Sequence, residues 1–195
     1  MKLILSSCDF SHEVSRACIS EHLPRPIEEC RVLFIPNEKA TAEKIQQGKY
    51  HLRLQQYGFS RENIFVFDHT RADEFKRLNL DMIYVSGGNT FLTMEKIRVS
   101  SFDQELIRYI KSGVIYIGGS AGAHIVTKEL RHLSVYDPVP ADWKDFSGLD
   151  LFHGILLCHF CEERRVHYEQ LLNEKIFPVI ALTDADSMII ETEEK

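Results

Sequence analysis

No hydrophobic run in this 195-residue chain is long enough to cross a membrane, because a spanning helix needs about 20 consecutive apolar residues. Residues 1–5 are too short for the apolar part of a secretory signal, and Cys8 comes too early for a lipid-attachment site. A surplus of positive charge is also absent, since 29 acidic residues against 23 basic ones give a net charge of −6. These absences argue against nucleic acid or an anionic membrane as the main partner.

Cysteine is scarce, and internal repeats, low-complexity tracts and linkers are absent. The five cysteines are odd in number and scattered, which fits reduced thiols in a cytosol better than a disulfide framework. With 44% hydrophobic residues, the chain is long enough to bury a substantial core. We therefore expect a cytoplasmic protein that forms one domain over residues 1–195.

Apolar segments rich in β-branched residues alternate with amphipathic segments along the whole chain. Strands are predicted at residues 2–7, 31–36, 63–67, 82–86, 114–117, 154–158 and 179–182. Helices are predicted near residues 13–23, 39–57, 72–78, 91–98, 102–112 and 123–128. This alternation is typical of an α/β fold, in which helices cover both faces of a parallel sheet.

The segment Gly-Gly-Ser-Ala-Gly-Ala at residues 118–123 lies between a predicted strand and a predicted helix. Gly118 and Gly122 leave room for a tight turn, so the hydroxyl of Ser120 can stand clear of the sheet. The free N–H groups and the positive end of the following helix suit an oxyanion. The pattern therefore predicts Ser120 as a nucleophile. The alternative is a glycine turn that contains an ordinary capping serine.

A second polar loop, Ser-Gly-Gly-Asn-Thr at residues 86–90, follows another predicted strand. In a parallel sheet the carboxyl ends of the strands share one edge, so this loop is expected near Ser120. A glycine N–H there could supply a second oxyanion donor. The alternative is a strand-to-helix loop in which Asn89 or Thr90 caps the next helix, and the two uses are compatible.

A serine nucleophile needs a base, and His159 is the strongest candidate among nine histidines. It follows the predicted strand at residues 154–158 and so stands at a strand end, although a buried core histidine is the competing interpretation. His124 lies one helical turn beyond Ser120 and is expected to pack there. Five others occur in polar context and are expected to be solvated, namely His12, His22, His51, His69 and His132.

Several aspartates could orient the base, and position alone does not choose among them. An acid in such loops is usually a solvated turn residue. The candidates are Asp137, Asp142, Asp145 and Asp150 after the serine, and Asp184 and Asp186 after the last predicted strand.

The Ser-Gly-Gly-Asn-Thr loop, the Gly-x-Ser-Ala-Gly-Ala turn and the His159-Phe160 strand end together resemble the peptidase E family, or aspartyl dipeptidases. The resemblance extends from the first strand to about residue 190. It implies a flavodoxin-like fold related to class I glutamine amidotransferases, with serine in place of cysteine. It also implies a serine–histidine–acid triad that cleaves short peptides near the N-terminus, without metal or cofactor, and it leaves a homodimer open.

By that resemblance, Ser120 matches the nucleophile and His159 the base, while Gly88 and Ala121 match the backbone oxyanion donors. The family acid lies in an Asp-x-Pro-type segment between the serine and the histidine, which favours Asp137. Cyanophycinase-like relatives instead take an acid after the next strand. In this chain that position corresponds to Asp184 or Asp186.

Substrate contacts follow less directly from the sequence. The aspartyl preference of the family depends on a basic residue beyond the histidine, where this chain has Arg164 and Arg165 after two acids. Either arginine could bind a carboxylate as a bidentate fork, although surface arginines on a solvated helix are the commoner case. Asn89 and Thr90 are the other predicted substrate-binding residues. The family resemblance therefore supports peptidase activity in this chain better than it supports a preference for aspartate.

Three other classes remain open from the sequence. The Gly-x-Ser-x-Gly pattern also occurs in esterases of the α/β-hydrolase type, which are larger. Cys158 and Cys161 form a CxxC pair of the kind found in redox proteins, and the same residues could ligate a metal, although no second ligand pair appears. A binding protein that keeps the turn but has lost turnover is the third.

Overall fold

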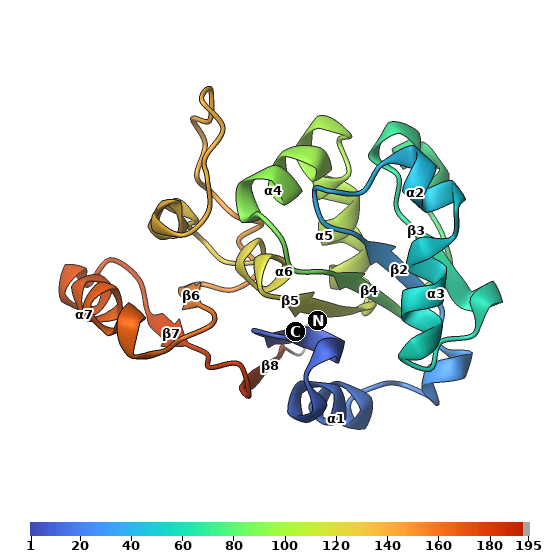
Figure 1. The fold of residues 1–195 in the computed structure, drawn as a ribbon, viewed down its shortest axis with the longest axis horizontal. Helices are drawn as coiled ribbons and strands as arrows, with labels where there is room; N and C mark the ends of the chain where they lie inside the picture. The colour runs from blue at the N-terminus through green and yellow to red at the C-terminus, as the bar shows by residue number, and fades with distance from the viewer. Residues whose placement is uncertain (193–195) are drawn as a thin grey trace.

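The computed structural model describes residues 1–192 (Figure 1). The strands are β1 Lys2–Ser6, β2 Val32–Ile35, β3 Ile64–Val66, β4 Met82–Val85, β5 Ile115–Gly119, β6 Ile155–Leu157, β7 Val179–Ala181 and β8 Ser187–Glu191. The α-helices are α1 Glu13–Glu21, α2 Ala42–Gln46, α3 Lys49–Gln56, α4 Thr90–Val99, α5 Asp103–Lys111, α6 Ala121–His124 and α7 Arg165–Glu174. Among these described residues, no helix is both long and apolar enough to span a bilayer.

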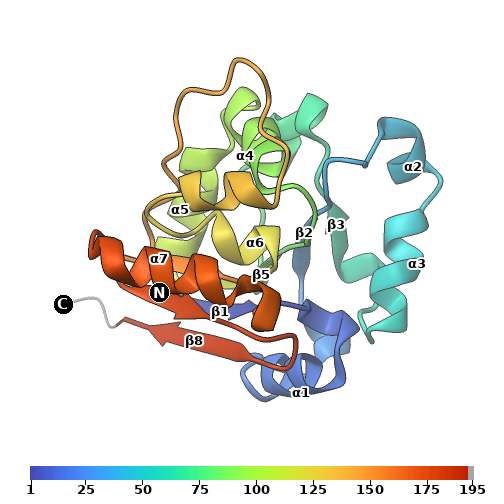
Figure 2. The same ribbon diagram turned by 60° about the vertical axis from the view of Figure 1, so that its left-hand side comes forward.

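Six strands form the central sheet in the order β3-β2-β4-β5-β1-β8. All neighbours in it are parallel except β8, which runs antiparallel to β1 at the edge. β6 and β7 form a separate parallel pair beside this sheet, covered by α7 (Figure 2). The predicted α/β fold with a mostly parallel sheet is therefore confirmed.

Successive residues of each central strand face opposite layers of the core, as the period of a strand requires. Leu33 of β2 belongs to a buried cluster that includes residues of α4 and α5, whereas Phe34 belongs to a second cluster that includes residues of α1 and α3. Both faces of the strands are apolar because helices cover both (Figure 1). Polar side chains that could take part in a reaction are therefore expected where the strands end.

Three predicted helices differ from the structure. The helix expected at 39–57 is divided into α2 and α3 by Gly48, whose φ of 73° is left-handed. The helix expected at 72–78 is a 3₁₀ segment, His69–Phe75, and the one expected at 123–128 ends at His124. The edge strand β8 was not predicted. It matters for function because it turns the segment after β7 back towards β1 (Figure 2).

The expectation that His132 is solvated was wrong. Its side chain is buried, and its Nε2 lies 2.7 Å from the carbonyl oxygen of Leu156 in β6. Burial lowers the pKa of His132 to about 4. The ring is therefore neutral at neutral pH and donates its Nε2 proton to β6.

We expect the free energy of unfolding to fall on acidification, because the unfolded chain binds a proton at His132 near the ordinary pKa of about 6.5. This contribution is complete above pH 6.5 and is lost as the pH falls towards 4, by about 3 kcal/mol. When the free energy of unfolding is measured by urea titration at a series of pH values, it should fall less steeply on acidification for His132→Gln than for wild type. The exposed His153→Gln serves as control, and equal slopes for His132→Gln and wild type would contradict the expectation.

Candidate active site

Ser120 lies at the junction of β5 and α6 in a conformation that L-residues rarely adopt. Its φ of 49° and ψ of −110° place it in a strained region that costs about 1–3 kcal/mol. The flanking glycines permit the turn: a Cβ on Gly118 would lie 2.5 Å from the Gly122 carbonyl oxygen, and one on Gly122 would overlap the carbonyl of Val85. The Ser120 N–H donates to the carbonyl of Ser6 at 2.8 Å, which fixes the turn to β1.

The structure brings the hydroxyl of Ser120 together with His159 and an aspartate. The Oγ of Ser120 is 2.9 Å from Nε2 of His159, and Nδ1 of His159 is 2.6 Å from Oδ1 of Asp184. The hydrogen bond to His159 holds the pKa of Asp184 below its ordinary value. A carboxylate there keeps the imidazole proton on Nδ1 and leaves the Nε2 lone pair facing the hydroxyl. The three groups can thus act as a nucleophile, a base and an orienting acid.

Asp137, expected beside His159, lies elsewhere. Its Oδ2 accepts a hydrogen bond from the N–H of Thr90 at 2.8 Å, so it holds the start of α4. Asp186 accepts from the N–H and the hydroxyl of Thr183 and closes the turn around Asp184. Of the aspartates that the sequence left open, the structure therefore places Asp184, and not Asp137, against the His159 ring. Asp184 reaches the site because the β7–β8 turn lies beside the end of β6.

The position of His159 depends on Ser7, which the sequence did not single out. His159 has a left-handed φ of 53°, and its N–H donates to the Oγ of Ser7 at 3.0 Å. The Ser7 hydroxyl in turn donates to the carbonyl of Leu182 at 3.0 Å, two residues before Asp184. One buried hydroxyl just after β1 thus connects the backbone of His159 with the segment that leads to Asp184. A serine after a strand is too common for this role to be visible in sequence.

His124 packs behind the site, as expected from its spacing after Ser120. Its Nε2 accepts a hydrogen bond from the N–H of Cys158 at 3.3 Å, so the Nδ1 proton faces the Oγ1 of Thr90, also at 3.3 Å. Burial holds the pKa of His124 well below its ordinary value, which keeps the ring neutral. His124 thereby ties α6 to the loops that carry His159 and Gly88.

Two backbone N–H groups on the segments around Ser120 are left unpaired within the described residues. Among residues 1–192, no protein acceptor is found for the N–H of Ala121 or of Gly88. The loop of Gly88 runs beside Ser120, since a Cβ on Gly87 would lie 3.2 Å from the Cβ of Ser120. Because α6 has only four residues, the local N–H groups matter here more than a long helix dipole.

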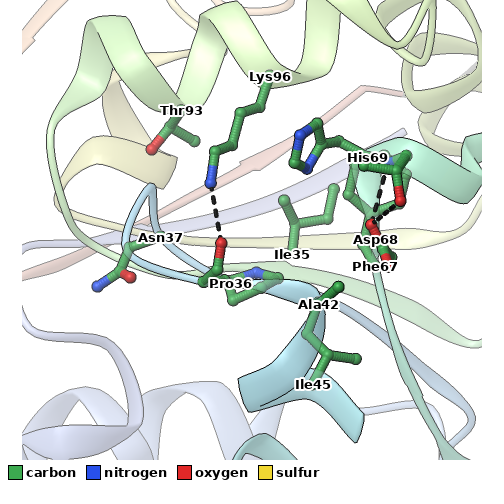
Figure 3. A pocket seen from close by; sticks show the side chains of 12 residues that line it. Ile35, Pro36, Asn37, Ala42, Ile45, Phe67, Asp68, His69, Thr93 and Lys96 are labelled. Atoms are coloured by element: carbon green, nitrogen blue, oxygen red, sulfur yellow. Dashed lines mark hydrogen bonds between the residues drawn. The ribbon is translucent and has the colours of Figure 1, made fainter.

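The loop after β2 supports the Gly88 segment from outside. Glu38 packs against Gly88 and accepts from the N–H of Asn89 at 3.0 Å, while Nζ of Lys96 donates to the carbonyl of Glu38 at 2.6 Å. Figure 3 shows Lys96 reaching from α4 over a cavity of about 40 Å³ between β2, β3 and α4. Neither Ser120 nor His159 lines this cavity, so it is structural space rather than part of the site.

The four predicted substrate-binding residues divide into two groups. Thr90 is fully buried, and Asn89 caps α4 through its Oδ1 and donates to the Pro138 carbonyl, so these side chains serve the fold. Arg165 is exposed and pairs with Glu162. Arg164 donates to the carbonyl of Cys158 at 2.6 Å, directly before His159. Its guanidinium also stacks 4.0 Å over the ring of Tyr136.

The cysteines give no support to a redox pair. Cys158 is fully buried, and burial raises the pKa of its thiol to about 12, whereas Cys161 is exposed. A reactive thiol requires the opposite shift. A third cysteine, Cys8, is half-buried next to His159 and Asp184, and burial followed by the Asp184 carboxylate raises the pKa of its thiol to about 11.

Solved structures share this architecture. A protein of Listeria monocytogenes named as a peptidase E superimposes with a TM-score of 0.76 at 20% identity, covering 99% of this chain and 95% of its own. A peptidase from an acI-B1 actinobacterium gives a TM-score of 0.67 at 15% identity over 97% of this chain and 82% of that one. These likenesses define the class of fold as an α/β fold of peptidase E type.

The family follows from sequence. The family model for peptidase family S51 matches residues 3–195, so the chain belongs to that family and is a serine-type peptidase. An uncharacterized peptidase of Pasteurella multocida is 29% identical over 69% of this chain and 67% of its own length. Peptidase E of Salmonella gallinarum is 35% identical over 47% of this chain and 39% of its own. The resemblance to peptidase E is thus confirmed.

Proposed function

We propose that this peptidase hydrolyses short peptides through an acyl-enzyme formed on Ser120. The observation that carries the proposal is the continuous hydrogen-bonded path from Ser120 Oγ through His159 to Asp184, with distances of 2.9 and 2.6 Å. Acyl transfer requires a nucleophile beside a base and N–H donors for the oxyanion. Ser120 lies beside the His159 ring, and the N–H groups of Ala121 and Gly88 on neighbouring segments are unpaired. Membership of a peptidase family makes the peptide bond the natural substrate.

In the proposed mechanism Ser120 Oγ attacks the scissile carbonyl carbon while its proton passes to Nε2 of His159. The N–H groups of Ala121 and Gly88 bind the oxyanion that forms. Collapse breaks the C–N bond, and the Nε2 proton leaves with the amine. Water then attacks the Ser120 ester as His159 takes its proton, and the same proton returns to Ser120. Asp184 stays ionised and stabilises the imidazolium in both steps.

Arg164 is the proposed contact for an acidic substrate residue. It lies against the segment that carries His159 and offers five N–H donors, of which the Cys158 carbonyl and the Tyr136 ring engage only part. We propose that its remaining donors bind a carboxylate on the residue whose carbonyl is attacked. An Asp-X dipeptide is therefore the substrate class that this arrangement favours.

A dipeptide library with varied first residues tests the proposal. Wild-type enzyme should release free amino acids and prefer acidic first residues. Arg164→Met should raise KM for acidic dipeptides by about 10–100-fold, because it removes a charged hydrogen bond, and should change KM for a Leu-X dipeptide much less. Arg165→Met is the matched control. Hydrolysis of p-nitrophenyl esters without any dipeptide turnover would instead indicate an esterase.

A further inference from the structure

Three different metal-binding side chains meet at the acid end of the proposed triad. Cys8, His159 and Asp184 each present a ligand atom, and these atoms all lie within 4.8 Å of one another. They come from three separate segments of the chain, after β1, β6 and β7. The set of one thiol, one imidazole and one carboxylate is a donor combination that suits Zn²⁺.

We propose that Cys8, His159 and Asp184 form an inhibitory Zn²⁺ site that switches the peptidase off reversibly. The inference rests on the function proposed above. It assigns Cys8, which has no part in the proposed hydrolysis, the role of third ligand. The ion would take three protein ligands and one water, as zinc does at open sites.

The geometry needs only local adjustment. Zinc bonds of about 2.0–2.3 Å in a tetrahedron place donor atoms roughly 3.5 Å apart. Nδ1 of His159 and Oδ1 of Asp184 are now 2.6 Å apart and would separate, while the thiol would approach, each by about an ångström of side-chain rotation. The side chains of His159 and Asp184 are 37% and 63% exposed, so an ion can enter from solvent.

Zinc at this position would stop the reaction by changing the tautomer of His159. In the active form the proton sits on Nδ1 and the Nε2 lone pair faces Ser120. A metal on Nδ1 binds through the lone pair of Nδ1, so the ring proton must move from Nδ1 to Nε2. Nε2 then donates to Ser120 Oγ and cannot accept its proton. The Cys8 thiol gives up its proton to solvent when the Zn–S bond forms, and no other reactant is required.

The test separates metal binding from turnover. Chelator-treated Ser120→Ala protein is titrated with ZnCl₂ by calorimetry, and one ion per chain is expected. Adding Cys8→Ala or Cys8→Ser should weaken binding by about 100-fold or more, while the exposed Cys161→Ala should not change it. Co²⁺ should give a thiolate charge-transfer absorption that the Cys8 variants lack. Equal zinc affinity with and without Cys8 would overturn the site.

Inhibition is measured on the active enzyme, each variant against its own metal-free rate. Zn²⁺ should abolish wild-type hydrolysis with the affinity found by calorimetry, and EDTA should restore it. Cys8→Ser should need about 100-fold more zinc. Zinc bound through Cys8 without inhibition would overturn the inhibitory role. If no peptide is hydrolysed at all, the proposed function fails, yet calorimetry and the Co²⁺ spectrum still decide the site.

Discussion

Ser120→Ala is expected to lower kcat/KM for dipeptide hydrolysis by about 10⁴-fold or more, because within residues 1–192 no other hydroxyl is hydrogen-bonded to the imidazole ring of His159. The change removes one oxygen from a half-exposed side chain and leaves the glycine packing intact, so stability should change by no more than about 0.5 kcal/mol. Rates are compared by single-turnover assay and stability by urea unfolding.

The matched control is Ser134→Ala, which removes an exposed hydroxyl outside the site and should keep the wild-type rate. A Ser120→Ala protein that still turns over at the wild-type rate would refute the nucleophile assignment. A protein that loses activity only because it unfolds is recognised by its unfolding curve.

The second large effect distinguishes two aspartates. Asp184→Asn should reduce kcat/KM by about 10³–10⁴-fold, because the amide no longer fixes the Nδ1 tautomer or stabilises the imidazolium of His159. Asp137→Asn should cost far less, since its contact is an accepted hydrogen bond from the Thr90 N–H, which the asparagine carbonyl can also accept. The measurement is steady-state kinetics on both variants with the same dipeptide.

Asp186→Asn is the neighbouring control, because Asp186 only closes the turn through Thr183. A larger loss for Asp137→Asn than for Asp184→Asn would reverse the assignment and restore the acid that the family resemblance favoured.

The fold was predictable because both faces of the central strands are apolar, and because residue patterns in the sequence mark where most of the helices between them begin and end. Gly48 was the exception: its left-handed φ is not distinguishable in sequence from an ordinary helical glycine. β8 was missed because a short edge strand at the end of a chain has no following helix to mark it. Its antiparallel pairing with β1 depends on contacts between residues far apart in sequence.

Part of the site was predictable because, in a parallel sheet, functional side chains gather where the strands end. Ser120 and His159 stand at strand ends and meet, although His159 comes from the separate β6–β7 pair rather than from the central sheet. The sequence left the acid open among Asp137, Asp184 and Asp186, because several aspartates follow the serine. Only the tertiary path of the β7–β8 turn brings Asp184 to His159. His132 shows the same limit, since polar neighbours in sequence did not reveal that β6 covers it.

The proposed mechanism requires that His159 activate the hydroxyl of Ser120. The most direct measurement is the rate at which a fluorophosphonate labels the protein, with the modified residue located by peptide mass spectrometry. We expect a single phosphonylated residue, Ser120, and a labelling rate that falls by at least about 100-fold in His159→Gln. Labelling of another residue, or equal labelling of Ser120 with and without the imidazole, would contradict it.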